Sequence, residues 1–107
     1  MSPGVSAVPV LARDIPHAVW VAVDAAIASL PPEGGIVSLS AVLDRLGIET
    51  GADPAAPRMK RFVTRAMHLR GATTFTRARC RCGGSYRVTG EVRATVRSEG
   101  IERRAEA

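Results

Sequence analysis

The residues best suited to chemistry are gathered in one stretch, TRARCRCGGSYRV, at residues 76–88. It holds four arginines, two cysteines and a pair of glycines. Thiolates bind metal ions or exchange disulfides, whereas arginines bind phosphates. The stretch therefore allows three interpretations: a metal-binding knuckle, a redox pair, or a basic hairpin that lies on a nucleic-acid backbone.

The cysteines give weak support to the first two interpretations. Cys80 and Cys82 supply two ligands, and the nearest additional candidates are His68 and His17. A zinc site takes three or four protein ligands, so zinc would require ligands from a second chain. The C-x-x-C spacing of redox pairs is absent. We expect neither a metal ion nor another cofactor.

A hairpin accounts for the whole stretch. Two predicted strands, from Thr74 to Cys82 and from Tyr86 to Thr89, are joined by the three-residue loop GGS, which would pair Cys82 with Tyr86 and Cys80 with Val88. This register is favoured because a slip of one residue would turn every side chain to the other face. The cysteines then act as small apolar side chains on the inner face. The outer face carries only arginines: Arg77, Arg79, Arg81 and Arg87.

The charge distribution indicates a partner for these arginines. The first 57 residues carry a net charge of −4, residues 58–97 carry +10, and the last ten carry −1. Charged runs are most often solvated surface, but a surface without an anionic partner gains from interspersed acids. The basic block therefore favours binding to a polyanion.

Three predicted helices position the basic residues. The first begins at Asp14, which we expect to cap its first turn, and buries a stripe of apolar residues at three- and four-residue steps. The short apolar stretch IVSL predicts a strand. The second helix, in SLSAVLDRLGI, is predicted to begin after its cap Ser38 and to end at Gly47.

The third helix, PRMKRFVTRAMHLRG, has two different faces. Its predicted buried side holds Met59, Phe62, Val63, Ala66, Met67 and Leu69. Its other side holds Lys60, Arg61, Thr64, Arg65 and His68, with no Asp or Glu to support the exposed helix by ion pairing. Phosphate groups would supply the missing negative charge.

This order of three helices, a short strand and a basic two-stranded hairpin resembles the winged helix–turn–helix superfamily from about Asp14 to Thr89. The likeness is greatest in SLSAVLDRLGI and in the basic helix followed by the hairpin. It implies an α+β fold that is mainly α, with the third helix in the DNA major groove and the hairpin, or wing, on the backbone or minor groove. We expect a flexible segment at 1–13, the winged helix–turn–helix domain at 14–90, and a tail or short helix at 91–107.

The resemblance and the charge together predict a DNA-binding protein, either a small transcriptional regulator or an accessory factor of a mobile element or replicon. Base edges in the groove would meet Lys60, Arg61, Thr64, Arg65 and His68. Phosphates or the minor groove would meet Arg77, Arg79, Arg81 and Arg87. The alternative is an adaptor that docks an acidic protein through the same basic face. The scarcity of aromatic residues argues against RNA binding.

Other classes of function find little support. The sequence lacks a P-loop, an HExxH and a GxSxG motif, so we do not expect an enzyme. No segment approaches the roughly 18 consecutive apolar residues of a membrane span, and the first residues lack a basic n-region. We expect a cytoplasmic protein that binds double-stranded DNA and no membrane, and a homodimer is compatible with the sequence.

Overall fold

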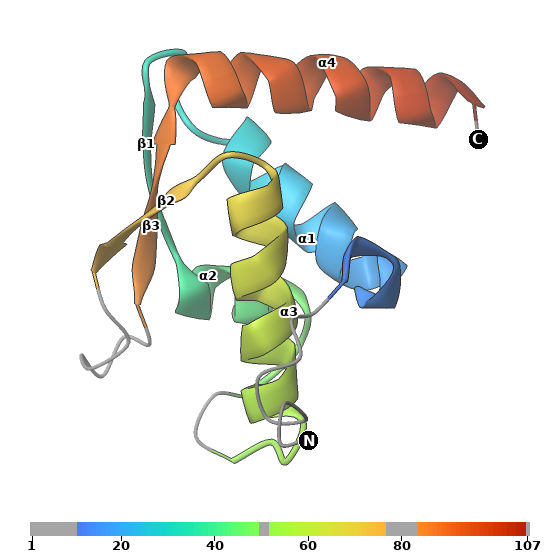
Figure 1. Cartoon of the computed structure of the whole chain (residues 1–107), viewed down its shortest axis with the longest axis vertical. Coiled ribbons are helices and arrows are strands. Elements are labelled where there is room, and N and C mark those ends of the chain that lie inside the picture. Colours follow the sequence, from blue (N-terminus) through green and yellow to red (C-terminus); the bar gives the residue numbers. More distant parts are fainter. Residues whose placement is uncertain (1–10, 50–51, 77–83, 107) are drawn as a thin grey trace, which may run out of the picture.

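The computed structural model describes residues 11–49, 52–76 and 84–106. Within these ranges it contains four α-helices, a short 3-10 helix and a three-stranded antiparallel sheet, so the protein is an α+β protein that is mainly helical (Figure 1). Most of the predicted N-terminal segment lies outside the described residues. So do Cys80 and Cys82, and Arg77, Arg79 and Arg81, which were predicted to lie on the wing.

The first helix, α1 (His17–Ala28), follows the 3-10 helix η2 (Ala12–Asp14). Asp14 was expected to cap α1, but its carboxylate accepts a hydrogen bond from the Leu11 amide at 3.3 Å and so caps η2 instead. Pro16 fixes the extended backbone from which α1 begins. The predicted apolar stripe is buried, including Val19, Ala22, Val23, Ala26 and Ile27.

The predicted strand and second helix are confirmed. Strand β1 (Gly34–Ser38) runs directly into α2 (Leu39–Arg45). The Ser38 hydroxyl accepts a hydrogen bond from the Ala41 amide at 3.1 Å, which satisfies a free donor of the first turn. Gly47, with a φ of 74°, ends the helical segment in a conformation that favours glycine.

The long helix α3 (Ala56–Leu69) has Pro57 in its first turn and is followed by Gly71 at a φ of 99°. Its apolar face packs against α1 and α2, with Phe62, Val63, Ala66 and Met67 in the core. Leu69 was predicted on this buried side, but 42% of its surface is exposed. It lies at the edge of the apolar face and at the last residue of the helix, where the covering by neighbouring helices ends.

The sheet has the order β1-β3-β2, in which β2 (Thr73–Thr76) and β3 (Ser85–Thr89) are antiparallel. Tyr86 pairs with Val37 of β1 on one side and with Thr74 of β2 on the other. The predicted pairing of Tyr86 with Cys82 is therefore wrong. Strand β3 is the central strand, and both of its edges are already occupied opposite Tyr86.

The C-terminal segment was predicted to be a tail or a short helix, but it forms the helix α4 (Gly90–Glu106), which has 17 residues. The helix begins directly after β3, and the Thr89 hydroxyl accepts a hydrogen bond from the Val92 amide at 3.2 Å. Val96 is 3% exposed and belongs to the core, which α4 joins mainly by packing on α1. Figure 1 shows α4 crossing the top of the fold, with its C-terminal end extending beyond the other elements.

Two glycines allow two backbone segments to pass very close to each other. One segment is the start of β1, and the other is the junction of β3 and α4. A Cβ atom on Gly34 would overlap the Val88 carbonyl oxygen, and one on Gly90 would lie 2.5 Å from the Pro32 oxygen. Side chains at either position would push these backbones apart. The close approach therefore fixes the start of α4 against the turn between α1 and β1.

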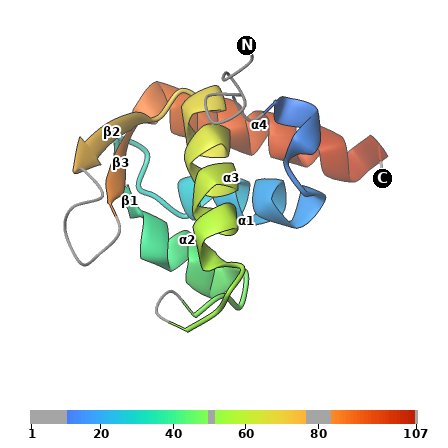
Figure 2. The same ribbon diagram turned by 60° about the horizontal axis from the view of Figure 1, so that its bottom comes forward.

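The helices lie on one side of the sheet (Figures 1 and 2). Tyr86 and Val88 point into the core from this inner face, while Arg87 and Ile36 are exposed on the outer face. In the described part of the chain, no helix has the length and apolar character needed to cross a membrane.

Candidate nucleic-acid interface

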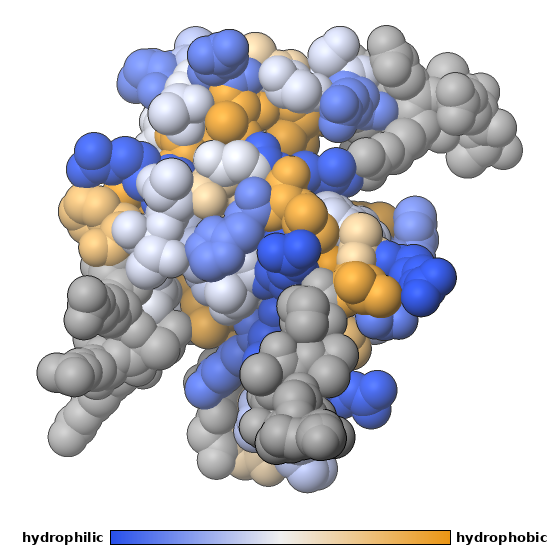
Figure 3. Space-filling model, in the orientation of Figure 1, coloured by the Kyte–Doolittle hydropathy of each residue, from blue (hydrophilic) through white to orange (hydrophobic). Residues whose placement is uncertain are grey.

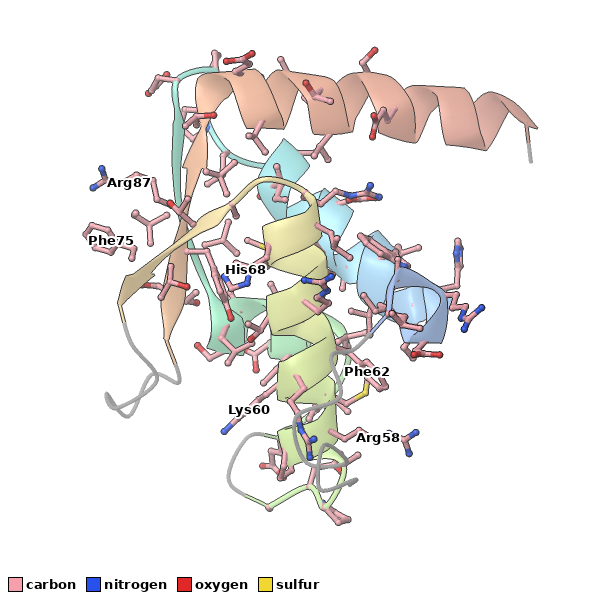
Figure 4. All side chains as sticks on the ribbon, in the orientation of Figure 1. Arg58, Lys60, Phe62, His68, Phe75 and Arg87 are labelled. Carbon is pink, nitrogen blue, oxygen red and sulfur yellow. The ribbon has the colours of Figure 1, made fainter. Side chains whose placement is uncertain are left out.

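The titratable residues of α3 are all basic, and they lie on the exposed side of the helix and along its margins. Arg61 and His68 are exposed, whereas Lys60 and Arg65 are half-buried. In Figure 4, Lys60 and His68 point to the flank beside the sheet, and Arg58 points to the opposite flank. No Asp or Glu occurs in the sequence between Asp53 and Glu91. The helix therefore presents positive charge along much of its length, and hydrophilic residues lie over its middle in Figure 3.

Thr64 attaches this helix to the sheet. Its hydroxyl oxygen lies 2.6 Å from the hydroxyl oxygen of Tyr86, within hydrogen-bond distance. Tyr86 is only 4% exposed. Burial raises the pKa of the Tyr86 phenol because the charged form is poorly solvated there, and the hydrogen bond to Thr64 opposes this by lowering it. The Thr64 hydroxyl is thus the partner of a buried phenol, and contact of Thr64 with DNA stays a prediction.

His68 makes a second link between α3 and the sheet. Its Nε2 atom lies 3.1 Å from the Thr74 hydroxyl oxygen on β2, and its ring meets the Tyr86 ring edge-on with 5.9 Å between centroids. The three residues Thr64, His68 and Tyr86 thus set the position of α3 relative to β2 and β3. His68 is an exposed residue despite these two contacts.

The N-terminal part of α3 keeps its cations on the surface. The Arg58 guanidinium lies 5.6 Å from the centre of the Phe62 ring, a cation–π contact that shields the edge of the core. Arg61, about one helical turn after Arg58 and next to Lys60 in the sequence, is exposed. Arg58 and Arg61 are thus the exposed cations of this part of α3, and Arg65 in the next turn is half-buried.

Arg70 directly follows α3, and its side chain makes contacts within the protein. Its guanidinium donates two hydrogen bonds to the Asp24 carboxylate, at 2.8 and 2.9 Å, and lies 4.4 Å from the centre of the Trp20 ring. Glu99 of α4 is 3.8 Å away. This arginine belongs to the basic block in the sequence, but its charge is used to join α1, α3 and α4.

Arg87 lies apart from α3. It alternates with the inward-facing Tyr86 and Val88, so its side chain emerges on the outer face of the sheet, as the predicted alternation required. There its guanidinium lies 4.9 Å from the centre of the Phe75 ring (Figure 4). The structure therefore brings Lys60, Arg61, Thr64, Arg65 and His68 together on one helix and places Arg87 on a separate surface. Arg77, Arg79 and Arg81 lie outside the described residues.

Two features of this region were not predicted from the sequence. Phe75, 53% exposed, was expected only as part of a strand, and its contact with Arg87 follows from the strand register. Tyr86 was expected as an inner-face residue, and its hydrogen bond to Thr64 joins residues 22 positions apart. The lone tyrosine at an inward position was the available signal, because a buried phenol needs a polar partner.

Comparisons of the chain with protein-family models, with curated proteins and with solved structures find no match. The geometry and charge of the protein itself must therefore carry any statement about its function.

Proposed function

We propose that the protein is a winged helix–turn–helix DNA-binding protein in which α3 enters the major groove and the β2–β3 region acts as the wing. The order α1–β1–α2–α3–β2–β3, with β3 between β1 and β2, supports this proposal. So does the basic side of α3, where Arg58, Arg61 and His68 are exposed and Lys60 and Arg65 are half-buried. A role as a small transcriptional regulator, or as an accessory factor of a mobile element or replicon, fits a chain of 107 residues.

The observation that carries the proposal is the uniform charge of α3. Arg58, Lys60, Arg61 and Arg65 lie within eight residues, and no carboxylate occurs in the chain from Pro54 to Gly90. Cations of the same sign this close together repel one another in the isolated protein. DNA phosphates would relieve that repulsion and release counterions at the same time.

The residues of α3 divide into two roles under this proposal. Arg61 and Arg65 are the side chains suited to the O6 and N7 atoms of guanine, and Lys60 to a phosphate or base edge. Thr64 and His68 act mainly through position, since they hold α3 against β2 and β3. Arg87, on the outer face of the sheet, is not needed for contact in the groove.

The test is binding of the full chain to duplex DNA, measured by fluorescence anisotropy with a selected preferred sequence and with random-sequence duplex at two salt concentrations. Arg61→Ala and Arg65→Ala should weaken binding to the preferred sequence by about 1–3 kcal/mol, and binding to random duplex by less. Arg97→Ala is the matched control, because Arg97 is an exposed arginine on α4, away from α3. It removes the same charge from a different surface.

A different result would favour the adaptor function. If the full chain binds no duplex, while Arg61→Ala and Arg65→Ala abolish binding to an acidic protein, the basic face docks protein. Equal losses for Arg61→Ala, Arg65→Ala and Arg97→Ala on every duplex would show that net charge, and no particular surface, drives the binding.

A further inference from the structure

The outer face of the sheet carries a small surface with the chemistry of a stacking site. Arg87, at the centre of β3, pairs with Ile36 of β1 and Thr73 of β2, so the three side chains form one row across the sheet. Phe75 lies beside this row, with the Arg87 guanidinium 4.9 Å from its ring centre. Phe75 is 53% exposed and Ile36 is 44% exposed. Figure 4 shows Phe75 and Arg87 projecting from the same edge of the molecule.

The backbone at Phe75 is irregular in a way that aims the ring outward. The pairing of β2 with β3 shifts register between Thr74 and Thr76, so a bulge lies at Phe75. Bulges redirect side chains and often occur next to functional sites. The ring is presented to solvent while its neighbour Thr74 faces α3 and contacts His68.

The charge of this surface indicates that its ligand is an anion. Arg87 is exposed, and its contact with Phe75 leaves a guanidinium fork beside an aromatic ring. Arg87 forms no ion pair within the described residues, and three more arginines follow β2 in the sequence. An aromatic ring beside a cation suits a flat base joined to a phosphate, since the base stacks and the phosphate forms a charge-assisted hydrogen bond.

We propose that the outer face of the sheet binds an unpaired nucleotide of a single-stranded nucleic acid, with the base stacked on the Phe75–Arg87 pair and the adjoining phosphate bound by Arg87. Ile36 extends the apolar surface under the sugar or a second base. The site is separate from α3, because Arg87 and Phe75 lie on the face of the sheet opposite to Tyr86 and Thr74. The inference rests on the proposed function only in taking nucleic acid as the ligand.

The experiment measures anisotropy of a labelled oligothymidylate of about 12 nucleotides with the full chain, and of a duplex in parallel. Phe75→Leu keeps an apolar side chain but removes the ring. It should weaken oligothymidylate binding by about fivefold to about 150-fold, the loss expected for one base–aromatic stack. Phe75→Trp should retain or strengthen binding. Arg87→Ala should lower the salt slope of single-strand binding by about 0.7, the value for one phosphate contact.

Two controls separate this site from general effects. Val21→Ala alters an apolar residue of α1 that is 54% exposed, and Arg97→Ala removes a charge from α4. Both should leave oligothymidylate binding within about twofold of the unchanged chain, and thermal unfolding should show that Phe75→Leu remains folded. Duplex binding through α3 should respond to Arg61→Ala and not to Phe75→Leu.

The outcomes distinguish this inference from the proposed function. If Phe75→Leu weakens only the single strand while the duplex still depends on Arg61, both stand. If oligothymidylate binding depends on Phe75 and no duplex binds, the stacking site stands and the duplex function falls. Oligothymidylate binding that is absent, or that is insensitive to Phe75→Leu and Arg87→Ala, overturns the inference, as does a dependence on Phe75 seen only with an acidic peptide.

Discussion

Thr64 shows how one side chain can link a predicted binding surface to the core. Its hydroxyl lies 2.6 Å from that of the buried Tyr86. We expect Thr64→Val, which keeps the shape of the side chain, to lower the free energy of unfolding by about 1–3 kcal/mol, because the phenol loses its hydrogen-bond partner. Urea unfolding measures this. The Thr64→Val/Tyr86→Phe double variant should lose less than the sum of the two single changes.

Thr73→Val is the matched control for this prediction. Thr73 is an exposed threonine on the outer face of the sheet, so its change should alter the free energy of unfolding by no more than about 0.5 kcal/mol. If Thr64→Val costs no more than Thr73→Val, the hydrogen bond contributes nothing to stability.

The same residue pair predicts a dependence on alkaline pH. Burial raises the pKa of Tyr86 above its ordinary value of 10.0. The folded protein therefore holds the phenol proton at a pH where the unfolded chain has lost it. The stabilisation from this group is complete below pH 10.0 and is lost as the pH rises through the pKa of the folded state. Tyr86 is the sole tyrosine, so tyrosinate absorbance follows it directly.

We expect the absorbance midpoint to lie above 10.0 in the folded protein and to return to about 10 in denaturant. Thr64→Val should raise the folded midpoint further, because the Thr64 hydrogen bond lowers the pKa of Tyr86. A folded midpoint at or below 10.0 would contradict the burial of the phenol.

At the scale of the elements, the Arg70 cluster joins three helices. Arg70 and Asp24 have side chains that are 13% and 19% exposed, and their two hydrogen bonds connect the end of α3 to α1. We expect Asp24→Asn to lower the free energy of unfolding by about 1.5–3 kcal/mol, since a mostly buried guanidinium loses its charged partner. Chemical denaturation measures the change.

Glu99→Gln provides a control on the same arginine. The Glu99 oxygen is 3.8 Å from Arg70, and its side chain is 50% exposed, so solvent screens the interaction. The expected loss is below about 1 kcal/mol. If Asp24→Asn and Glu99→Gln lower the free energy of unfolding equally, the hydrogen bonds to Asp24 contribute no more to stability than the contact with Glu99.

The elements also show what could be predicted from the sequence. The helices α1, α2 and α3 follow from apolar spacing, and Ser38 and Gly47 mark the ends of α2 because caps and stops are local chemistry. The partner of Tyr86 could not be chosen in this way. Thr74 and Cys82 are eight positions apart, an even difference, so alternation alone would place both on the inner face. In the structure Thr74 takes this place, and Val37 of β1 pairs with Tyr86 from the other edge of β3.

The features of the candidate site could likewise be predicted from the sequence only where they are local. The exposure of Arg61 follows from its place on the helical wheel, which is a local property. The internal contacts of Thr64, His68 and Arg70 depend on where α1, β2 and β3 lie. Arg70 and Asp24 are 46 residues apart, and nothing in either local sequence indicates the pair.

For the whole molecule, α4 determines where the folded domain ends. Val96 is 3% exposed and packs in the same core as α1, although the domain was expected to end at residue 90. Val96→Ala should lower the free energy of unfolding by about 2 kcal/mol through lost burial and a cavity. Removal of residues 91–107 should destabilise the protein by more than this, as thermal unfolding will measure.

Val21→Ala is the control for this prediction, because Val21 is 54% exposed on α1. The same substitution at a surface position should cost at most about 0.5 kcal/mol. A chain ending at residue 90 with the stability of the full protein would show that α4 is an appendage.

The position of β3 between β1 and β2 also governs how the protein can be made. Synthesis proceeds from the N-terminus, so both outer strands leave the ribosome before the strand that joins them. The helices α1, α2 and α3 can pack at that stage, but each outer strand still has unpaired backbone groups. A chain broken off before Ser85 would keep both edges open to aggregation and proteolysis. The five residues Ser85–Thr89 are thus needed to pair both outer strands, and a product that lacks them would expose unpaired strand edges to proteases.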